Sequence, residues 1–465
     1  MTGRIDRVLI ANRGEIALRA VRAARALGLE TVAVYSTADR LSPHVLLADR
    51  AFCIGPPPST KSYLAGETLL HLAKATGCQA IYPGYGFLSE RASFALRCAE
   101  EGIVFIGPSA EVIRVMGDKA EARATAGRLG LPLVPGSDGA FTDRRAAEKA
   151  ADSIGFPLLL KARAGGGGRG MRIVREAAEF AAQFDQATRE AEAAFGDGAL
   201  YLERFFEAVR HIEVQVFGDS HGTMRHLGER DCTVQRRHQK LVEEGPSPVL
   251  SQDVRAAICD AAEALAKGVG YVGAGTVEFI YEPKSETFCF IEMNTRIQVE
   301  HPVTEMLVGH DLVAEQFRVA RGDALSVHIP ADGPRGHAIE FRINAEDWRS
   351  GFRPSPGRVD RWRPLAHPNV RVDTFMHPGA QIQPFYDSMI GKLIVHGASR
   401  DEALETARAA IDGFDIAGVA TTLDFHRALI ADPDFVAGAI HTRWVENAFL
   451  PRIQNARSEI PSHKP

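Results

Sequence analysis

Apolar and polar residues alternate in two neighbouring segments past the middle of the chain, residues 276–282 and 287–293. Both segments are rich in β-forming residues, and residues 283–286 between them are typical of a turn. The pattern therefore predicts a β-hairpin. When its strands pair, Glu278 faces Glu292, and two facing carboxylates repel each other unless a positive charge lies between them.

A divalent cation could supply that charge. Asn294 follows Glu292 by two residues and is expected on the same face. Carboxylate and amide oxygens suit Mg²⁺ or Mn²⁺, with phosphate oxygens completing the coordination. The sequence thus predicts a metal site at Glu278, Glu292 and Asn294. The alternative is an exposed hairpin face whose acidic side chains are solvated.

Polar residues continue to alternate through residues 294–302. Arg296, Gln298 and Glu300 are therefore expected on the same side as Glu292. This arrangement would bring an anion-binding cation, an amide and a potential base together beside the metal.

The first hundred residues alternate short apolar strands with amphipathic helices. The predicted strands are 7–11, 31–35, 80–82 and 103–106, and the predicted helices are 15–27, 65–76 and 92–101. Such βαβ units imply a parallel sheet with helical crossovers. No GxGxxG motif follows the first strand, so a dinucleotide-binding oxidoreductase is not favoured. A further helix is predicted from Lys119 to Arg128.

A glycine-rich segment separates two predicted strands at 157–162 and 171–174. It contains Gly165, Gly166, Gly167 and Gly168, whose backbone N–H groups could approach phosphates closely. Lys161 precedes the glycines, so this is not a Walker A loop. A mobile flap over a nucleotide is favoured, with a flexible hairpin turn as the alternative.

Charged residues also alternate along two other predicted strands. In 210–216, His211, Glu213 and Gln215 share one face, and in 336–347 Arg342 shares a face with Glu340. Residues 229–240 form the most densely charged segment, for which a solvated face is the simplest interpretation.

The composition narrows the class of protein. The chain has 465 residues, which is longer than a chain with a single hydrophobic core usually is, so two to four domains are expected. The formal charge of −5 and the absence of a basic cluster interleaved with aromatic residues argue against nucleic-acid binding. No apolar run has membrane-spanning length and no signal peptide is recognised, so a cytoplasmic protein without a membrane partner is expected. The six scattered cysteines are expected to be buried thiols.

The segment EMNTRIQVEHPVTE, residues 292–305, resembles the biotin carboxylases of the ATP-grasp superfamily. The motifs MGDK, ERDC and QRRHQK are also similar, and the resemblance extends from the first residues to about Asn447. The chain differs from the family at Tyr82 and Arg91, where His and Asn are usual, and at Arg163 and Ala164, where Ser and a fifth Gly are usual.

The resemblance implies a mixed α/β and α+β protein. A Rossmann-like N-terminal domain is expected over residues 1–118 and an ATP-grasp domain over 119–330, with a mobile lid at 131–209. A C-terminal biotin carboxylase domain is expected over 331–450. The polar tail is assigned to 451–465 and is expected to be disordered from Arg452.

The resemblance also implies roles for individual residues. Bicarbonate is expected to bind Arg296, Gln298 and the Val299 backbone, with Glu300 as the base, while Lys240 and Arg342 stabilise developing charge. The expected contacts of ATP and its Mg²⁺ or Mn²⁺ are Lys119, Lys161, the four flap glycines, Glu203, His211, Gln235, His238, Glu278 and Glu292. Tyr386 and Asp387 are expected to border the biotin site.

The expected reaction uses ATP and bicarbonate to carboxylate biotin through carboxyphosphate. None of the eight methionines precedes a lysine, so biotin is expected on a separate biotin carboxyl carrier protein. A carboxyltransferase subunit of an acyl-CoA carboxylase and a homodimer are further expectations from the family.

Several alternatives stay open. The chain could serve a pyruvate carboxylase or another biotin-dependent carboxylase. It could also be another ATP-grasp ligase that passes an acyl phosphate to an amine, or a non-catalytic subunit that keeps the fold.

Overall fold

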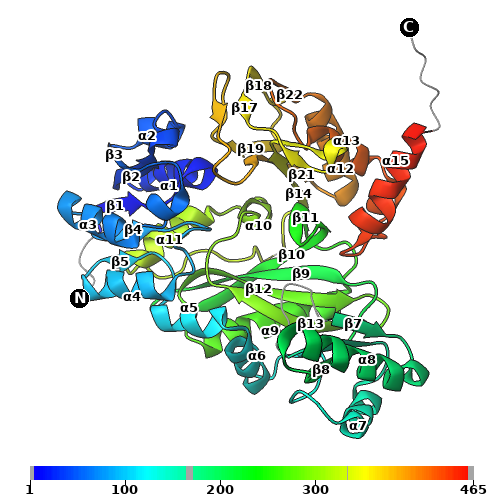
Figure 1. Cartoon of the computed structure of the whole chain (residues 1–465). Coiled ribbons are helices and arrows are strands. Elements are labelled where there is room, and N and C mark those ends of the chain that lie inside the picture. Colours follow the sequence, from blue (N-terminus) through cyan, green and yellow to red (C-terminus); the bar gives the residue numbers. More distant parts are fainter. Residues whose placement is uncertain (1–4, 164–170, 332, 459–465) are drawn as a thin grey trace.

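The computed structural model describes residues 5–163, 171–331 and 333–458. Figure 1 shows an N-terminal α/β domain, a large central sheet that continues into the C-terminal region, and a small lid built from α7, α8 and β6–β8. The glycines Gly165, Gly166, Gly167 and Gly168 lie outside the described residues.

The N-terminal domain is a five-stranded parallel sheet in the order β3-β2-β1-β4-β5. Val8 and Ile10 of β1 pack with α1 on one face, and Leu9 packs with α3 and α4 on the other. Burial on both faces explains the continuous apolar strands, and the predicted βαβ pattern is confirmed. The elements are β1 (Arg7–Ile10), α1 (Gly14–Ala26), β2 (Glu30–Ser36), η1 (Thr37–Asp39), α2 (Pro43–Leu47), β3 (Arg50–Gly55), η2 (Ser59–Lys61), α3 (Gly66–Thr76), β4 (Ala80–Tyr82), α4 (Ala92–Glu100), β5 (Val104–Phe105) and α5 (Ala110–Gly117).

An antiparallel eight-stranded sheet forms the centre of the molecule, in the order β13-β12-β9-β10-β11-β14-β21-β19. The predicted boundary between the ATP-grasp and C-terminal regions lies at residues 330 and 331. The sheet contains strands from both sides of this boundary, because β11 pairs with β14. Its first part and its helices are α6 (Lys119–Arg128), β9 (Arg210–Gly218), β10 (Met224–Arg236), β11 (Gln239–Gly245), α9 (Gln252–Gly268), β12 (Gly273–Glu282), β13 (Thr287–Asn294), α10 (His301–Val308) and α11 (Leu312–Ala320).

Helix α9 covers one face of this sheet. Ile212, Val214 and Val216 of β9 pack in one cluster with Ile258 and Leu265 of α9. Because side chains alternate along a strand, the polar residues of β9 lie on the opposite face.

The lid is a three-stranded antiparallel sheet, β7-β6-β8, packed against two helices. Leu158 and Leu160 of β6 are buried against Phe180 and Phe184 of α8. Its elements are α7 (Arg144–Ile154), β6 (Leu158–Ala162), β7 (Met171–Val174), α8 (Ala177–Phe195) and β8 (Leu200–Arg204).

The C-terminal region adds the last three strands of the central sheet and a helical layer. Ser399 caps α12 by accepting a hydrogen bond from the Glu402 amide. The elements are β14 (His337–Asn344), β15 (Glu346–Asp347), η3 (Trp348–Ser350), β16 (Arg353–Pro354), β17 (Gly357–Arg358), β18 (Arg361–Arg363), β19 (Val370–Thr374), β20 (Gln381–Ile382), β21 (Met389–Gly397), α12 (Arg400–Asp412), β22 (Asp415–Ala417), α13 (Leu423–Ile430), α14 (Pro433–Val436), η4 (Val445–Phe449) and α15 (Leu450–Ser458).

Two expectations from the sequence are corrected. The chain is not disordered from Arg452: helix α15 continues to Ser458, and Arg452 forms ion pairs with Asp432 and Asp434 that hold the helix to the domain. Cys53 is exposed, while the other five cysteines are buried thiols. Within the described part of the chain, no helix combines the length and the apolar character needed to cross a membrane.

Candidate active site

The hairpin predicted at residues 276–293 is present as β12 and β13, with Glu278 directly opposite Glu292. The pairing shifts by one residue between Glu278 and Phe279, so Ile291 forms a bulge. This bulge, which periodicity could not reveal, sets the register that pairs the two glutamates. Glu278 is buried, whereas the Glu292 side chain is 40% exposed.

Lys240 of β11 lies at the centre of a buried group of carboxylates. Its ammonium nitrogen donates to Glu213 at 2.5 Å, to Glu278 at 2.9 Å and to Glu300 at 2.8 Å. Three acids from three different elements thus converge on one cation, which offsets the cost of burying them together.

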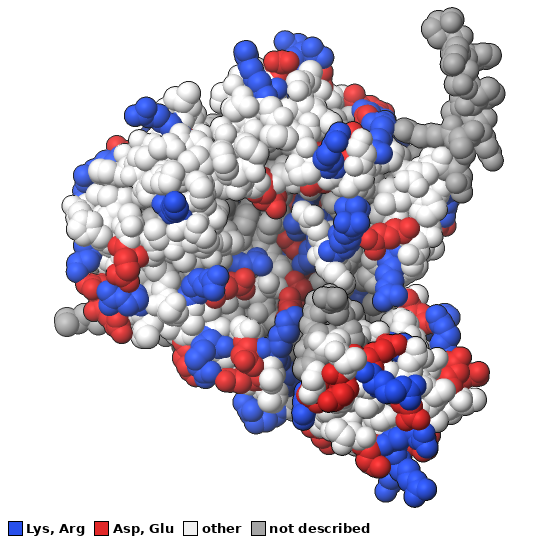
Figure 2. All heavy atoms as spheres, viewed as in Figure 1, with Lys and Arg blue, Asp and Glu red and all other residues white. Residues whose placement is uncertain are grey.

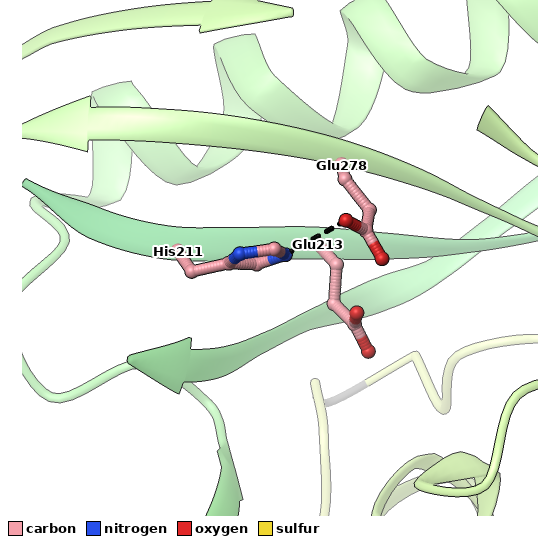
Figure 3. Close-up of side chains that lie close together, drawn as sticks. All are labelled: His211, Glu213 and Glu278. Atoms are coloured by element: carbon pink, nitrogen blue, oxygen red, sulfur yellow. Dashed lines mark ion pairs between the residues drawn. The ribbon is translucent and has the colours of Figure 1, made fainter. Parts of the chain in front are cut away.

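His211 adds a second partner to Glu278. Figure 3 shows both side chains pointing toward each other from adjacent strands, with Glu213 beside them, and His211 Nε2 lies 3.0 Å from Glu278 Oε2. Burial raises the pKa of Glu278, but Lys240 and His211 outweigh burial and hold this pKa well below its usual range. Glu278 is therefore ionised at neutral pH.

Three sets of described residues could ligate a metal here, and the buried set Glu213, Cys232 and Glu300 is one of them. His211, Glu213 and Glu278 bring their ligand atoms within 4.8 Å of one another, but the Lys240 ammonium already neutralises this set. The predicted set combines Glu278 with the more exposed Glu292 and with Asn294, whose amide donates to Glu278 at 2.8 Å. Carboxylate and amide oxygens suit Mg²⁺ or Mn²⁺, and the exposed Glu292 carboxylate is accessible to an ion, so the predicted set fits such a metal. Lys240 contacts Glu278 of this set as well.

Glu300 precedes α10 and contacts two cations. Its carboxylate accepts from Lys240 and, at 2.9 Å, from Arg342 Nη2. Arg342 also donates through Nε to Glu243 at 2.7 Å. Burial raises the pKa of Glu300, but Lys240 and Arg342 outweigh burial and place this pKa well below its usual range. The structure therefore brings the predicted base into contact with both predicted stabilising cations.

The segment between β13 and α10 is not the continuous strand that alternation predicted. β13 ends at Asn294, and the chain then bends to reach α10. Gln298 nonetheless reaches the buried group, because its amide donates to Glu278 at 2.8 Å. Arg296 is held instead by Glu90, whose carboxylate accepts from Arg296 Nε at 2.9 Å.

A cavity of about 440 Å³ lies beside Arg342, between the N-terminal and C-terminal domains. Tyr85, Val299, Tyr386 and Asp387 line it together with Arg342. Figure 2 shows the surface hollowed between these domains and the lid, with acidic and basic side chains in the hollow. The site thus joins a buried group of paired acids and cations to a partly aromatic cavity.

Sequence models of three successive domain families match the chain. Residues 4–113 match the biotin carboxylase N-terminal domain, 118–328 the carbamoyl-phosphate synthase L chain ATP-binding domain, and 340–447 the biotin carboxylase C-terminal domain. The chain is 50% identical to biotin carboxylase of Nostoc sp. over 95% of this chain and 99% of the relative. The chain belongs to the biotin carboxylase family. It is also 50% identical to biotin carboxylase 1 of Bacillus subtilis, over 95% of this chain and 98% of the relative.

Solved biotin carboxylases have the same architecture. The biotin carboxylase subunit of pyruvate carboxylase aligns with a TM-score of 0.89 and 46% identity, covering 97% of this chain and 99% of that one. The Campylobacter jejuni biotin carboxylase β-γ-ATP complex aligns with a TM-score of 0.83 and 45% identity, covering 95% and 98%. The predicted mixed fold, with an ATP-grasp region, is confirmed.

The predicted nucleotide contacts of this biotin carboxylase lie on the lid, on α6 and on the central sheet. Lys161 and Glu203 form an ion pair across the lid sheet. Lys119, at the start of α6, lies 3.7 Å from Glu292 and is otherwise exposed. Gln235 is buried near the end of β10, and His238 is exposed in the turn before β11.

Two departures from the biotin carboxylase pattern are accommodated structurally. Tyr82 is buried, donates to Gln316 at 3.1 Å and packs against Phe317. Arg163 forms an ion pair with Asp197 at 2.8 Å on the lid. Arg91 precedes α4, and Ala164 lies outside the described residues.

Three residues of the buried group were not selected from the sequence. Glu213 contacts Lys240, Glu243 contacts Arg342, and Arg230 donates to Glu213 at 2.6 Å. Two of them had a signal in the sequence: Glu213 alternates with His211, and Arg230 lies in the motif ERDC. Most of the segment 229–240 is not a solvated face: residues 229–235 are buried, and Arg230 and Asp231 form ion pairs with Glu213 and Arg210 of β9.

Proposed function

We propose that this chain carboxylates biotin with ATP and bicarbonate, through the residues predicted from its sequence. The observation that carries the proposal is the contact of Glu300 with both Lys240 and Arg342 at the edge of the cavity. A carboxylate between two cations, beside a space for a ring-shaped substrate, suits a reaction in which this carboxylate takes the proton of bicarbonate and the cations stabilise two successive anions.

The first step activates bicarbonate. Arg296, Gln298 and the Val299 backbone hold the anion, and one of its oxygens attacks the γ-phosphorus of ATP while the bond to the bridging oxygen breaks. Glu300 accepts the proton of bicarbonate. When the substrate anions are bound, they interact with Lys240 and Arg342. The two cations then stabilise the Glu300 carboxylate less, so the pKa of Glu300 rises and it becomes a stronger base.

Glu278, Glu292 and Asn294 would hold Mg²⁺ or Mn²⁺ during this step. The ion, when bound, neutralises charge on the phosphate oxygens. Lys119 and Lys161 supply further positive charge, and His211, Gln235, His238 and Glu203 complete the nucleotide site. The four flap glycines are proposed to cover the phosphates.

The second step occurs on the cavity side. Carboxyphosphate breaks into CO₂ and phosphate, and the phosphate takes the proton from the ureido nitrogen of biotin. That nitrogen then attacks CO₂. Arg342 faces the cavity and can stabilise the developing ureido oxyanion, because its charge is fixed and its guanidinium is planar.

Biotin-stimulated ATP cleavage tests the proposal. ADP formation is measured with and without bicarbonate, and then with free biotin added. We expect cleavage to require bicarbonate and to increase with biotin. An ATP-grasp ligase that delivers an acyl phosphate to an amine would use the same lid and metal acids, but biotin would leave its rate unchanged.

We further propose that biotin arrives on a separate carrier protein and that a carboxyltransferase subunit of an acyl-CoA carboxylase uses the product. Relatives named biotin carboxylase are matched over 99% and 98% of their own length, which supports a carrier supplied as a separate chain. A methylcrotonoyl-CoA carboxylase subunit alpha of Arabidopsis thaliana, 49% identical over 95% of this chain and 60% of its own length, supports the acyl-CoA assignment.

Co-purification tests the carrier. A tagged chain isolated from its own cells should retain a biotinylated protein detectable with streptavidin. The homodimer expected for the family is tested by the mass of the purified chain in solution, where a monomer would contradict it.

A further inference from the structure

Arg13 lines the same cavity as Arg342. It directly precedes α1, and its side chain is 12% exposed. Its guanidinium lies 4.0 Å from the centroid of the Tyr386 ring and 5.5 Å from that of Phe375, and both rings also line the cavity. One cation thus contacts two aromatic walls of the proposed biotin site.

Asp39 fixes the orientation of this guanidinium. Arg13 donates to it through Nε and Nη2, both at 2.7 Å, and the Tyr63 hydroxyl donates to the same carboxylate at 2.6 Å. Burial raises the pKa of Asp39, but Arg13 and Tyr63 outweigh burial and lower it. The pair is therefore charged at neutral pH, and the two parallel hydrogen bonds leave the guanidinium little rotational freedom.

Tyr386 is held at its other end as well. Its hydroxyl donates to the Pro57 carbonyl at 2.7 Å and lies 2.6 Å from the Ser36 hydroxyl. Pro57 and Ser36 belong to the N-terminal domain, whereas Tyr386 lies on the segment between β20 and β21 of the C-terminal domain. These contacts join the two domains at the cavity wall.

We propose that Arg13 is a positioning residue for the biotin ring, acting through Tyr386. By fixing the face and the hydroxyl of this ring, the Arg13–Asp39 pair and its neighbours set the width of the cavity next to Arg342. The inference rests on the proposed function and adds to it a determinant of biotin affinity that lies outside the reacting groups. If Arg13 only held the two domains together, its loss would affect the KM values for biotin and for ATP alike.

The test compares Arg13→Lys with the wild-type enzyme. Lysine keeps the charge but cannot form the two parallel bonds to Asp39 while covering the Tyr386 ring. We expect the KM for biotin to rise roughly tenfold, equivalent to about 1.4 kcal/mol, while the KM for ATP changes less than about twofold. Arg50→Lys is the matched control. The Arg50 guanidinium also lies over an aromatic ring, 5.4 Å from the centroid of Phe52, but neither residue lines the cavity.

Tyr386→Phe provides a second variant, because it keeps the ring beneath Arg13 and removes the hydroxyl contacts with Pro57 and Ser36. Tyr386→Phe should also raise the KM for biotin. If Arg13→Lys does not fold, the result for Tyr386→Phe decides the test. If folded variants keep the wild-type KM for biotin, or if the KM values for biotin and ATP rise equally, the positioning role is wrong. A wild-type enzyme that does not respond to biotin would instead remove the proposed function, and this inference with it.

Discussion

Lys240 carries the charge balance of the site. It is the cation shared by Glu213, Glu278 and Glu300, so it links the proposed metal site to the proposed base. Such a shared cation lets acids be ionised where burial alone would protonate them. The basicity of Glu300 consequently depends on how strongly substrates compete for Lys240 and Arg342.

Glu300→Gln tests the base at the scale of one residue. The amide keeps the shape of the side chain but cannot accept a proton from bicarbonate. We expect turnover to fall by roughly 10²–10⁴-fold, with nucleotide binding preserved. Glu282→Gln, at the end of β12 and outside the buried group, is the control. Near-normal turnover of Glu300→Gln would remove Glu300 from this role.

Arg342→Ala distinguishes the activation of bicarbonate by ATP from the carboxylation of biotin. Because Arg342 faces the cavity, its loss should reduce carboxylation of biotin by at least about 10²-fold, the scale of losing one oxyanion donor. Bicarbonate-dependent ATP cleavage should fall less. The two activities are measured on the same preparation, and equal losses in both would argue against an interaction with the biotin oxyanion.

At the scale of elements, strand pairing places functional groups that are distant in the sequence. β11 joins β14 with Glu243 directly opposite Glu340, both completely buried. Neither oxygen of Glu340 has a hydrogen-bond partner within the described residues. Burial and the charge of Glu243 raise the pKa of Glu340 well above its usual range, although Lys392 and Arg342 oppose this shift. Glu340 is therefore held as the neutral acid beside Arg342.

This arrangement predicts a pH-dependent stability. A carboxyl whose pKa is higher in the folded than in the unfolded protein contributes stability that is full below the unfolded pKa, and this contribution is lost as the pH rises toward the folded value. Glu340→Gln mimics the neutral acid at every pH. Its stability relative to the wild type should therefore increase with pH, by up to about 1.4 kcal/mol per pH unit. Denaturant unfolding between about pH 5 and pH 8 measures the difference; parallel curves for the two proteins would show that Glu340 is ionised.

At the scale of the molecule, three regions meet around one site: the parallel domain, the shared central sheet and the lid. Local periodicity predicted the βαβ units, the hairpin and the polar face of β9, because those signals lie within short segments. It could not predict the β11–β14 pairing that makes one sheet of two regions. The Ile291 bulge, the exposed Cys53 and the ordered α15 were also missed. Helix α15 depends on ion pairs of Arg452 with Asp432 and Asp434, which periodicity does not report.

The same limit applies to the site. Motif resemblance identified Lys240, Glu300 and Arg342, and the structure brings them into contact. Glu213, Arg230 and Glu243 were missed because their importance comes from partners on other strands. Arg13 was likewise absent from the predicted site residues. Its partner Asp39 is 26 residues away in the same domain and its partner Tyr386 lies in the C-terminal domain, so no local pattern connects the three.

The fate of bicarbonate oxygen tests the central claim most directly. The enzyme is supplied with ATP, biotin and bicarbonate labelled with heavy oxygen, and the phosphate released is analysed by mass spectrometry. If bicarbonate attacks the γ-phosphorus before biotin is carboxylated, each phosphate formed carries one labelled oxygen and carboxybiotin accumulates in equal amount. Unlabelled phosphate, produced when water attacks ATP, would contradict the account.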